Sequence, residues 1–187
     1  MCELLGMECN VPTDIVFSFS GLRQRGGKTG PHADGWGLAF YEGRATRVFL
    51  DPSPAAHSPL AHFLSEHPIK TLLAIGHIRR RTRGPTTLAN THPFVRELWG
   101  RHWVFAHNGT ISDLDFLARR SSGARRREVE GETDSERFFA FLLTAVDDAA
   151  GDPASAGLAL RRALDAALKR PSFGAANFLL RARKSVV

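Results

Sequence analysis

The chain opens with Met1-Cys2-Glu3-Leu4-Leu5-Gly6, and the cysteine in this stretch determines how the rest of the sequence is interpreted. If Met1 is removed, Cys2 becomes the first residue and carries an α-amine a few bonds from its thiol. An α-amine has a pKa of about 7.7–8.0, so part of it is neutral at pH 7. N-terminal nucleophiles use such an amine as the base that activates the side chain. The alternative is that Cys2 is a small packing residue, as most cysteines are.

The composition is typical of a globular protein. The 187 residues are 43% hydrophobic and 24% charged, which suits one domain with a sizeable core. Two cysteines, Cys2 and Cys9, imply no disulfide framework, and Cys9 is expected to pack as a small apolar residue. We see neither a secretory signal nor an apolar run of about 18 residues, so we expect a cytoplasmic protein that does not cross a membrane.

The chain is basic, with a net charge of +6 and a pI of about 10.1, which raises the question of nucleic-acid binding. Two arginine clusters, at 79–83 and 119–127, contribute to this charge. The second lies among serines and glycines and is expected to be a solvated loop. Neither cluster comes with a zinc-finger, helix-turn-helix or RNP-like pattern, so nucleic-acid binding is not favoured.

Hydrophobic spacing and turn residues predict one mixed α+β domain over residues 1–187. Helices are expected after Thr13, Ser58 and Thr133 as N-terminal caps, and a further helix over 154–170. Thr133-Asp134-Ser135-Glu136 has the spacing of a capping box. The expected strands are 36–41, 46–50, 71–78, 103–107 and 175–180, the first two forming a hairpin.

Four short motifs follow Cys2 in order, with a fifth segment between the second and the third. They are His32-Ala33-Asp34-Gly35-Trp36-Gly37, Gly76-His77-Ile78-Arg79, His107-Asn108-Gly109 and Gly131-Glu132-Thr133-Asp134-Ser135-Glu136, with Asn90-Thr91-His92-Pro93-Phe94 in between. In this order and spacing the chain resembles the class II glutamine amidotransferases, glutaminase domains of the N-terminal nucleophile hydrolase superfamily, and among them the stand-alone YafJ-like group. The resemblance runs from Cys2 to about Leu180. It implies a four-layer αββα sandwich.

The resemblance also implies catalytic roles. Cys2 would attack the side-chain amide of glutamine and form a γ-glutamyl thioester, with release of ammonia. Asn108 and Gly109 would form the oxyanion hole, through a side-chain amide and a backbone N–H. Their alternative role is a simple turn after an apolar strand, and a turn is expected there in either case. A glycine at this point would permit close approach and a positive φ.

Substrate binding is implied for five further residues. Arg79 would pair with the α-carboxylate of glutamine, assisted by Thr82. Asp134 would be the counter-ion of the α-ammonium, exposed at a pocket rim, and its competing role is to start a helix. His32 is expected in a loop that borders the pocket, and His92 is a candidate for the pocket wall.

The expected partners are L-glutamine or a γ-glutamyl amide, together with an unidentified ammonia acceptor or synthase. The likeness fades after Leu180, so residues 181–187 are a divergent tail and the sandwich is expected to be incomplete at its C-terminus. An unpaired strand edge there would favour a homo-oligomer. Two alternatives stay open: a hydrolase of a larger γ-glutamyl amide, and an inactive truncated relative that acts as a binding module. No cofactor or metal is expected, because five further histidines lack metal-ligand spacing: His57, His62, His67, His102 and His107.

Overall fold

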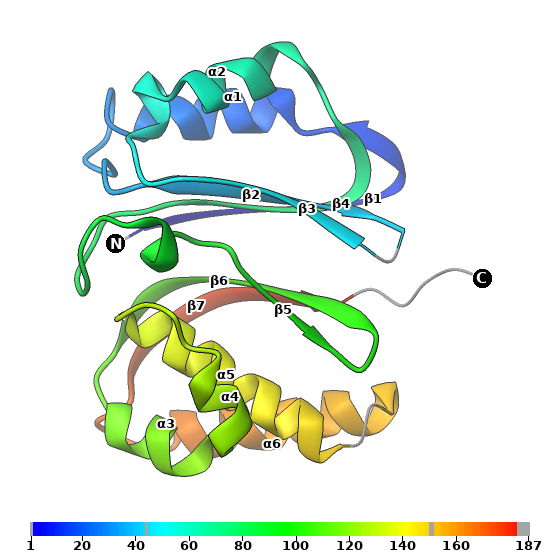
Figure 1. The fold of residues 1–187 in the computed structure, drawn as a ribbon, viewed down its shortest axis with the longest axis vertical. Helices are drawn as coiled ribbons and strands as arrows, with labels where there is room; N and C mark the ends of the chain where they lie inside the picture. The colour runs from blue at the N-terminus through cyan, green and yellow to red at the C-terminus, as the bar shows by residue number, and fades with distance from the viewer. Residues whose placement is uncertain (1, 44, 150–151, 183–187) are drawn as a thin grey trace.

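The computed structural model describes residues 2–43, 45–149 and 152–182, which form four stacked layers (Figure 1). The strands are β1 (Glu3–Asp14), β2 (Trp36–Glu42), β3 (Ala45–Asp51), β4 (Lys70–Ile78), β5 (Phe94–Leu98), β6 (Arg101–Ile111) and β7 (Gly174–Ala182). The helices are α1 (Val16–Arg25), α2 (Pro59–Glu66), α3 (Leu114–Arg120), α4 (Gly123–Arg127), α5 (Asp134–Asp148) and α6 (Pro153–Leu168). Short 3₁₀ turns lie at Ala55–His57 and Leu88–Asn90.

Two antiparallel sheets form the middle layers. The first has the strand order β1-β4-β2-β3 and the second has the order β5-β6-β7. Helices α1 and α2 cover the outer face of the first sheet, and helices α3 to α6 lie on the outer side of the second (Figure 1). The α+β class and the αββα order of layers are therefore as expected.

Each boundary between layers has its own apolar cluster. Phe19 and Trp36 pack between the first helices and the first sheet. Ile75 and Val104 lie between the two sheets, and Phe105 joins a large aromatic cluster with α5. Fully burying one such side chain contributes about 1.5–3 kcal/mol, so the three clusters hold the sheets in a fixed register.

The register of β1 on β4 sets the position of Cys2. Glu3 pairs with Ile78 and Leu4 with His77, so the residue before β1 meets the chain just after β4. Leu4 also packs in the cluster between the sheets, and side chains alternate along a strand. The side chain of Cys2 therefore belongs to the face that looks toward the second sheet.

Two predictions about local structure are wrong. Thr13 does not cap the first helix, because it belongs to β1 and its hydroxyl donates to the carbonyl of Val11. The Asp14 side chain instead accepts from the first helical N–H, that of Val16. The arginines at 119–127 are exposed as expected, apart from Arg125, but they lie in the helices α3 and α4 and not in a loop. Arg125 pairs with carboxylates on two segments.

The predicted turn at Asn108-Gly109 is also wrong, because β6 continues through both residues to Ile111. Gly109 pairs with Ala176 of β7 and is not among the glycines with positive φ. A Cβ atom at Gly109 would lie 2.0 Å from the carbonyl oxygen of Ala175. Glycine is needed here for close approach of two strands, while its backbone stays extended.

The last strand is longer than expected. β7 extends to Ala182, two residues into the predicted divergent tail, while residues 183–187 lie outside the described residues. Within the described part of the chain β7 pairs with β6 on one side. None of the helices described is long and apolar enough to cross a membrane.

Candidate active site

Cys2 lies between two segments that are distant in the sequence. Its backbone nitrogen donates to Oδ1 of Asn108 at 2.9 Å. Its Sγ atom lies 3.3 Å from the backbone nitrogen of Arg80, which donates to it, and 3.4 Å from the Arg80 carbonyl oxygen. In Figure 1 the start of β1 lies beside the loop that joins β4 to β5. The fold therefore brings Cys2, the end of β4 and the middle of β6 together.

The thiol of Cys2 has a raised pKa. Burial is the main cause, and the negative charge of Asp134 acts in the same direction. The backbone hydrogen bond from Arg80 and the positive charge of Arg79 lower the pKa but do not offset burial. The thiol is therefore protonated at neutral pH and needs a base before it can attack.

Asn108 and Gly109 present two donors near this thiol. Because Oδ1 of Asn108 accepts from the Cys2 nitrogen, its Nδ2 is turned elsewhere. The N–H of Ile111 points away from β7, since it donates to Asp134. Alternate residues of a strand direct their N–H groups to the same side, so the N–H of Gly109 also points away from β7. On that side β5 pairs with β6 only as far as Phe105, which leaves this part of β6 open.

Arg79 is 2% exposed and its guanidinium is held by backbone carbonyls. Nη1 donates to Pro85 at 2.9 Å, and Nη2 donates to Arg83 at 2.8 Å and to Gly84 at 3.3 Å. A guanidinium has five N–H donors, so these three bonds leave two for another acceptor. Burial lowers the pKa of Arg79, while the negative charge of Asp34 raises it.

The loop after Arg79 brings in some of the predicted residues and not others. Thr82 is exposed, and its side chain makes no hydrogen bond within the described residues. Asp34 accepts from the backbone nitrogen of Arg81 and from the hydroxyl of Thr86, which joins the predicted His32 loop to this segment. Nδ1 of His32 lies 3.8 Å from Oε1 of Glu3, the residue after Cys2. His32 therefore borders the site, whereas nothing in the structure ties Thr82 to it.

Asp134 is not exposed at a rim, as the sequence predicts, but is 3% exposed. Its Oδ2 accepts from the backbone nitrogen of Ile111 at 2.6 Å, and its other oxygen accepts no hydrogen bond from the described part of the chain. The cap of α5 is Thr133, whose hydroxyl accepts from the Glu136 nitrogen. The capping box is half formed, because the Glu136 carboxylate turns to the nitrogens of Glu130 and Gly131.

The predicted pocket-wall residue His92 lies in the interior. His92 is 3% exposed, and its ring stacks on His77 with 4.3 Å between ring centroids and lies tilted against Phe94 with 4.4 Å between centroids. His77 contacts the carbonyl oxygen of His107 through Nε2 at 3.1 Å, so the two rings support the strand that carries Asn108. Burial lowers the pKa of His77 to about 3 and that of His92 well below its usual value. No group of three or more His, Cys, Asp or Glu in the described ranges is arranged to hold a metal ion.

Sequence reasoning assigned no role to Asn90 and Glu132. Asn90 is fully buried beside the Arg79 loop and makes hydrogen bonds to Glu132, 42 residues away. The signal that could have found them is their place in the sequence: Asn90 and Glu132 are polar residues inside the quoted motifs to which no function was assigned. Their partnership is a tertiary contact that no local pattern encodes.

The family model described as "Glutamine amidotransferases class-II" matches residues 1–187. "Putative glutamine amidotransferase YafJ" of Escherichia coli is 55% identical over 143 residues, which are 76% of this chain and 54% of that protein. The "Gamma-glutamyl-hercynylcysteine sulfoxide hydrolase" of Mycobacterium tuberculosis is 30% identical over 97 residues, or 51% of this chain and 39% of that protein.

Among solved structures, a predicted glutamine amidotransferase from Pseudomonas aeruginosa superposes with a TM-score of 0.66 and 42% identity, covering 96% of this chain and 69% of that one. The chain spans about half the length of the curated relatives it matches. The arrangement around Cys2 and these likenesses agree, and the chain belongs to the class II glutamine amidotransferases.

Proposed function

We propose that this chain hydrolyses the side-chain amide of L-glutamine through a γ-glutamyl thioester on Cys2 and releases ammonia. The observation that carries the proposal is the 2.9 Å contact between the Cys2 nitrogen and Asn108 Oδ1. It joins the atom that becomes the α-amine to the side chain that would stabilise the oxyanion. The two residues of this contact are 106 positions apart in the sequence, so the tertiary fold brings them together.

The first step depends on removal of Met1, which frees the α-amine of Cys2. Because burial raises the pKa of the Cys2 thiol, the sulfur needs a base, and the amine is attached to the same α-carbon. With a pKa of about 7.7–8.0, the amine takes the thiol proton without a large shift. Within the described residues the sulfur has hydrogen-bond partners on the Arg80 backbone alone, so no side chain competes for this role.

Attack of Sγ on the amide carbon forms a C–S bond and places negative charge on the former carbonyl oxygen. Nδ2 of Asn108 and the N–H of Gly109 would donate to that oxygen. Loss of one such donor typically costs about 3–4 kcal/mol in the barrier. Collapse breaks the C–N bond, and the ammonium proton passes to the leaving nitrogen, which departs as ammonia. Water then hydrolyses the thioester and regenerates the thiol.

Arg79 and Asp134 would hold the charges of the free amino acid. Arg79 has two N–H donors left for the α-carboxylate after its three carbonyl bonds. Asp134 has one carboxylate oxygen without a hydrogen bond in the described chain, and it would take the α-ammonium. The charges of both groups act on the pKa of the Cys2 thiol, Arg79 lowering it and Asp134 raising it. His32 would be a contact at the edge of this site, and the role of Thr82 stays a prediction.

A second candidate function is hydrolysis of a larger γ-glutamyl amide by the same groups. It is favoured by one observation, the likeness to a relative whose printed name is that of a γ-glutamyl hydrolase. Ammonia or amine release from glutamine, compared with release from a panel of γ-glutamyl amides, separates the two functions. The acceptor of the ammonia, a homo-oligomeric state and a cytoplasmic location stay predictions.

The test of the proposed function compares the two cysteines. N-terminal sequencing and intact mass should find Cys2 as the first residue of the active protein. A glutamine-mimicking diazoketone should add one label to the wild-type chain and to Cys9→Ala, and none to Cys2→Ala. Cys2→Ala should release no ammonia from glutamine. Turnover by a chain that retains Met1, or unchanged turnover in Cys2→Ala, contradicts the mechanism.

A further inference from the structure

Asn90 is a fully buried side chain for which the proposed mechanism has no use. Its Nδ2 donates to the carbonyl of Pro85 and the hydroxyl of Thr87, both at 3.1 Å, and to Oε2 of Glu132 at 2.7 Å. Its Oδ1 accepts from the backbone nitrogen of Glu132 at 2.8 Å. Both ends of the amide are therefore used, and Glu132 is contacted twice. We call Asn90 and Glu132 the joint.

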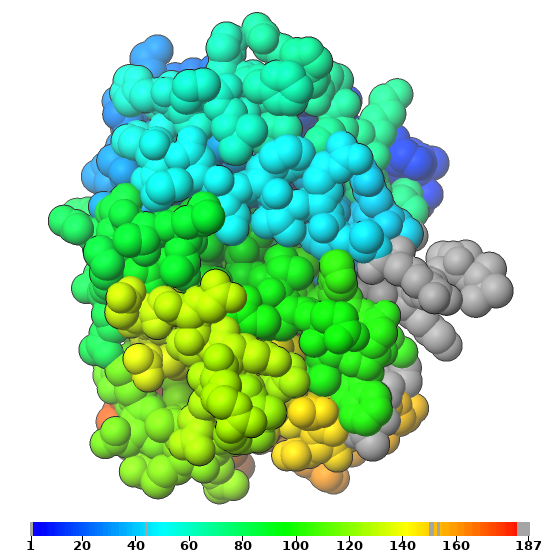
Figure 2. Space-filling model, viewed as in Figure 1, coloured from blue at the N-terminus to red at the C-terminus, as the bar shows by residue number. Residues whose placement is uncertain are grey.

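Two glycines leave space for the joint. A Cβ atom on Gly131 would lie 2.3 Å from Oδ1 of Asn90. Gly84 has a φ of +75°, and a Cβ atom there would lie 3.0 Å from Nδ2 of Asn90. In Figure 2 the green chain near residue 90 meets the yellow-green segment near residue 130. The Asn90 side-chain amide is therefore closely packed by the segments that contain Gly84 and Gly131, and glycine at both positions permits this close approach.

On one side the joint reaches the carbonyls that hold Arg79. The oxygen of Pro85 accepts from Asn90 and also from Nη1 of Arg79. The neighbouring carbonyls of Arg83 and Gly84 accept from Nη2. Because three carbonyls of one short loop orient the guanidinium, any shift of this loop moves Arg79 with it.

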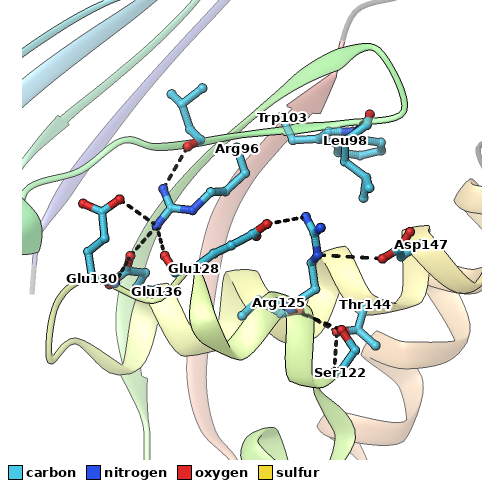
Figure 3. Close-up of polar contacts among 12 residues, drawn as sticks. Arg96, Leu98, Trp103, Ser122, Arg125, Glu128, Glu130, Glu136, Thr144 and Asp147 are labelled. Atoms are coloured by element: carbon cyan, nitrogen blue, oxygen red, sulfur yellow. Dashed lines mark hydrogen bonds and ion pairs between the residues drawn. The ribbon is translucent and has the colours of Figure 1, made fainter.

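On the other side the joint belongs to the segment before α5, which hydrogen bonds and an ion pair hold in place. Glu132 lies two residues before Asp134, and the segment between 128 and 132 is fixed to β5 and α5 (Figure 3). Arg96 of β5 pairs with the buried Glu136 at 2.6 Å and donates to the carbonyl of Glu128. Glu136 in turn accepts from the nitrogens of Glu130 and Gly131 at 3.0 and 2.7 Å.

We propose that Asn90 and Glu132 are positioning residues that fix the separation between Arg79 and Asp134, and so select a ligand carrying both an α-carboxylate and an α-ammonium. The inference rests on the proposed function, in which those two groups hold the two charges of glutamine. Within the described residues the hydrogen bonds of the Cys2 sulfur go to the Arg80 backbone and not to the joint. Its effect is therefore on recognition of the doubly charged end of the substrate.

The test uses three amides that differ in these charges: L-glutamine, glutaramate without the amine, and 4-aminobutanamide without the carboxylate. Asn90→Ala should raise the KM for glutamine about tenfold, because hydrogen bonds that orient the Arg79 loop are lost. Turnover of 4-aminobutanamide should stay within about twofold, because it has no carboxylate for Arg79, and glutaramate should lose less than glutamine, because it needs no fixed separation between two charges. Equal loss with all three amides, or an unchanged glutamine KM, overturns the proposal.

Glu132→Ala provides a second variant that leaves the buried amide in place, because Glu132 is exposed apart from this contact. It should show the same selective effect at about threefold, and the double variant should lose no more than Asn90→Ala alone, since the two residues act as one unit. Leu88→Ala, in the same loop and 56% exposed, is the matched control and should leave all three substrates unchanged. Cys2-dependent ammonia release by the wild type is measured separately and tests the proposed function alone, so a failure of the joint leaves that function standing.

Discussion

The layer between the two sheets has two unlike halves. Away from Cys2 it is filled by aliphatic side chains and by Tyr41, whose hydroxyl contacts the carbonyls of His102 and Arg181 at 3.2 and 2.6 Å. Near Cys2 it contains imidazole rings instead. Nδ1 of His77 and both ring nitrogens of His92 are buried without a hydrogen-bond partner in the described structure. We call these the apolar half and the polar half.

The difference between the two halves suggests that the apolar half contributes stability and that the polar half serves the site around Cys2. An apolar layer between sheets stabilises the fold through burial, whereas buried polar atoms without partners cost free energy. The polar half holds the strand next to Asn108 in place, since His77 bonds to the carbonyl of His107, the residue before Asn108. Changes in the polar half should therefore alter activity and acid stability, and changes in the apolar half should alter stability alone.

The largest effect is expected from Gly109→Ala. The added Cβ would lie 2.0 Å from the Ala175 carbonyl oxygen and must push β6 and β7 apart beside Asn108. Glutamine turnover should fall about thousandfold through displacement of the proposed oxyanion donor, and the free energy of unfolding should fall by about 3 kcal/mol. Steady-state ammonia release and urea unfolding measure the two effects.

Gly157→Ala in α6 is the matched control, because a Cβ atom there meets nothing within 4 Å. It should raise the free energy of unfolding by about 0.5–1 kcal/mol through helix propensity and leave turnover unchanged. Full activity in Gly109→Ala would place the oxyanion donor elsewhere.

The next effect is acid destabilisation of the polar half. The pKa of His77 is lowered to about 3 in the folded chain by burial, so His77 stays neutral there while the unfolded chain binds a proton below about pH 6.5. The contribution of His77 to the free energy of unfolding should be constant above that pH and fall by about 1.4 kcal/mol per pH unit below it, or about 2 kcal/mol between pH 6.5 and 5. His92, whose pKa is also lowered, adds to the same loss.

Urea unfolding at a series of pH values measures this loss. His77→Gln keeps a nitrogen that can donate to the His107 carbonyl but does not titrate, so it should make the pH dependence shallower by one proton. An unchanged slope in His77→Gln would mean that another group is responsible.

The elements that the sequence predicts correctly are those whose conformation depends on residues close together in the sequence. The β2–β3 hairpin, the helix after Ser58 and the helix after Thr133 follow from turn residues, caps and apolar spacing, and the structure contains all three. The strand over 71–78 is buried on both faces and carries a largely apolar run. The family likeness was readable because five motifs stand in order behind Cys2.

The features that the sequence predicts wrongly are those whose conformation depends on pairing between segments far apart in the sequence. β1 is an edge strand with an irregular register and exposed positions, so its pattern lacks a clear period. Asn108-Gly109 looks like a turn, but β7 pairs with it and keeps it extended. Asp134 was expected at a rim because helix starts are usually exposed, whereas the end of β6 covers it. The roles of these site residues stay predictions.

A smaller effect in the polar half is expected from Arg79→Lys. Lysine carries one ammonium with three donors and cannot both satisfy the three loop carbonyls and pair with a carboxylate. The KM for glutamine should rise more than about tenfold, which corresponds to about 1.4 kcal/mol. Steady-state kinetics measures this, with the exposed Arg120→Lys on α3 as control. An unaltered KM would remove Arg79 from substrate binding.

The smallest effect tests the apolar half directly. Tyr41→Phe removes a buried hydroxyl and leaves two carbonyls without its contact, so the free energy of unfolding should fall by about 1–1.5 kcal/mol. The KM and kcat for glutamine should not change, because Tyr41 lies at the opposite end of β2 from the site. Denaturant unfolding and steady-state kinetics on the same preparation measure both. If Tyr41→Phe raises the KM as much as Arg79→Lys does, the two halves are coupled through the sheets, and stability and chemistry are not divided between them.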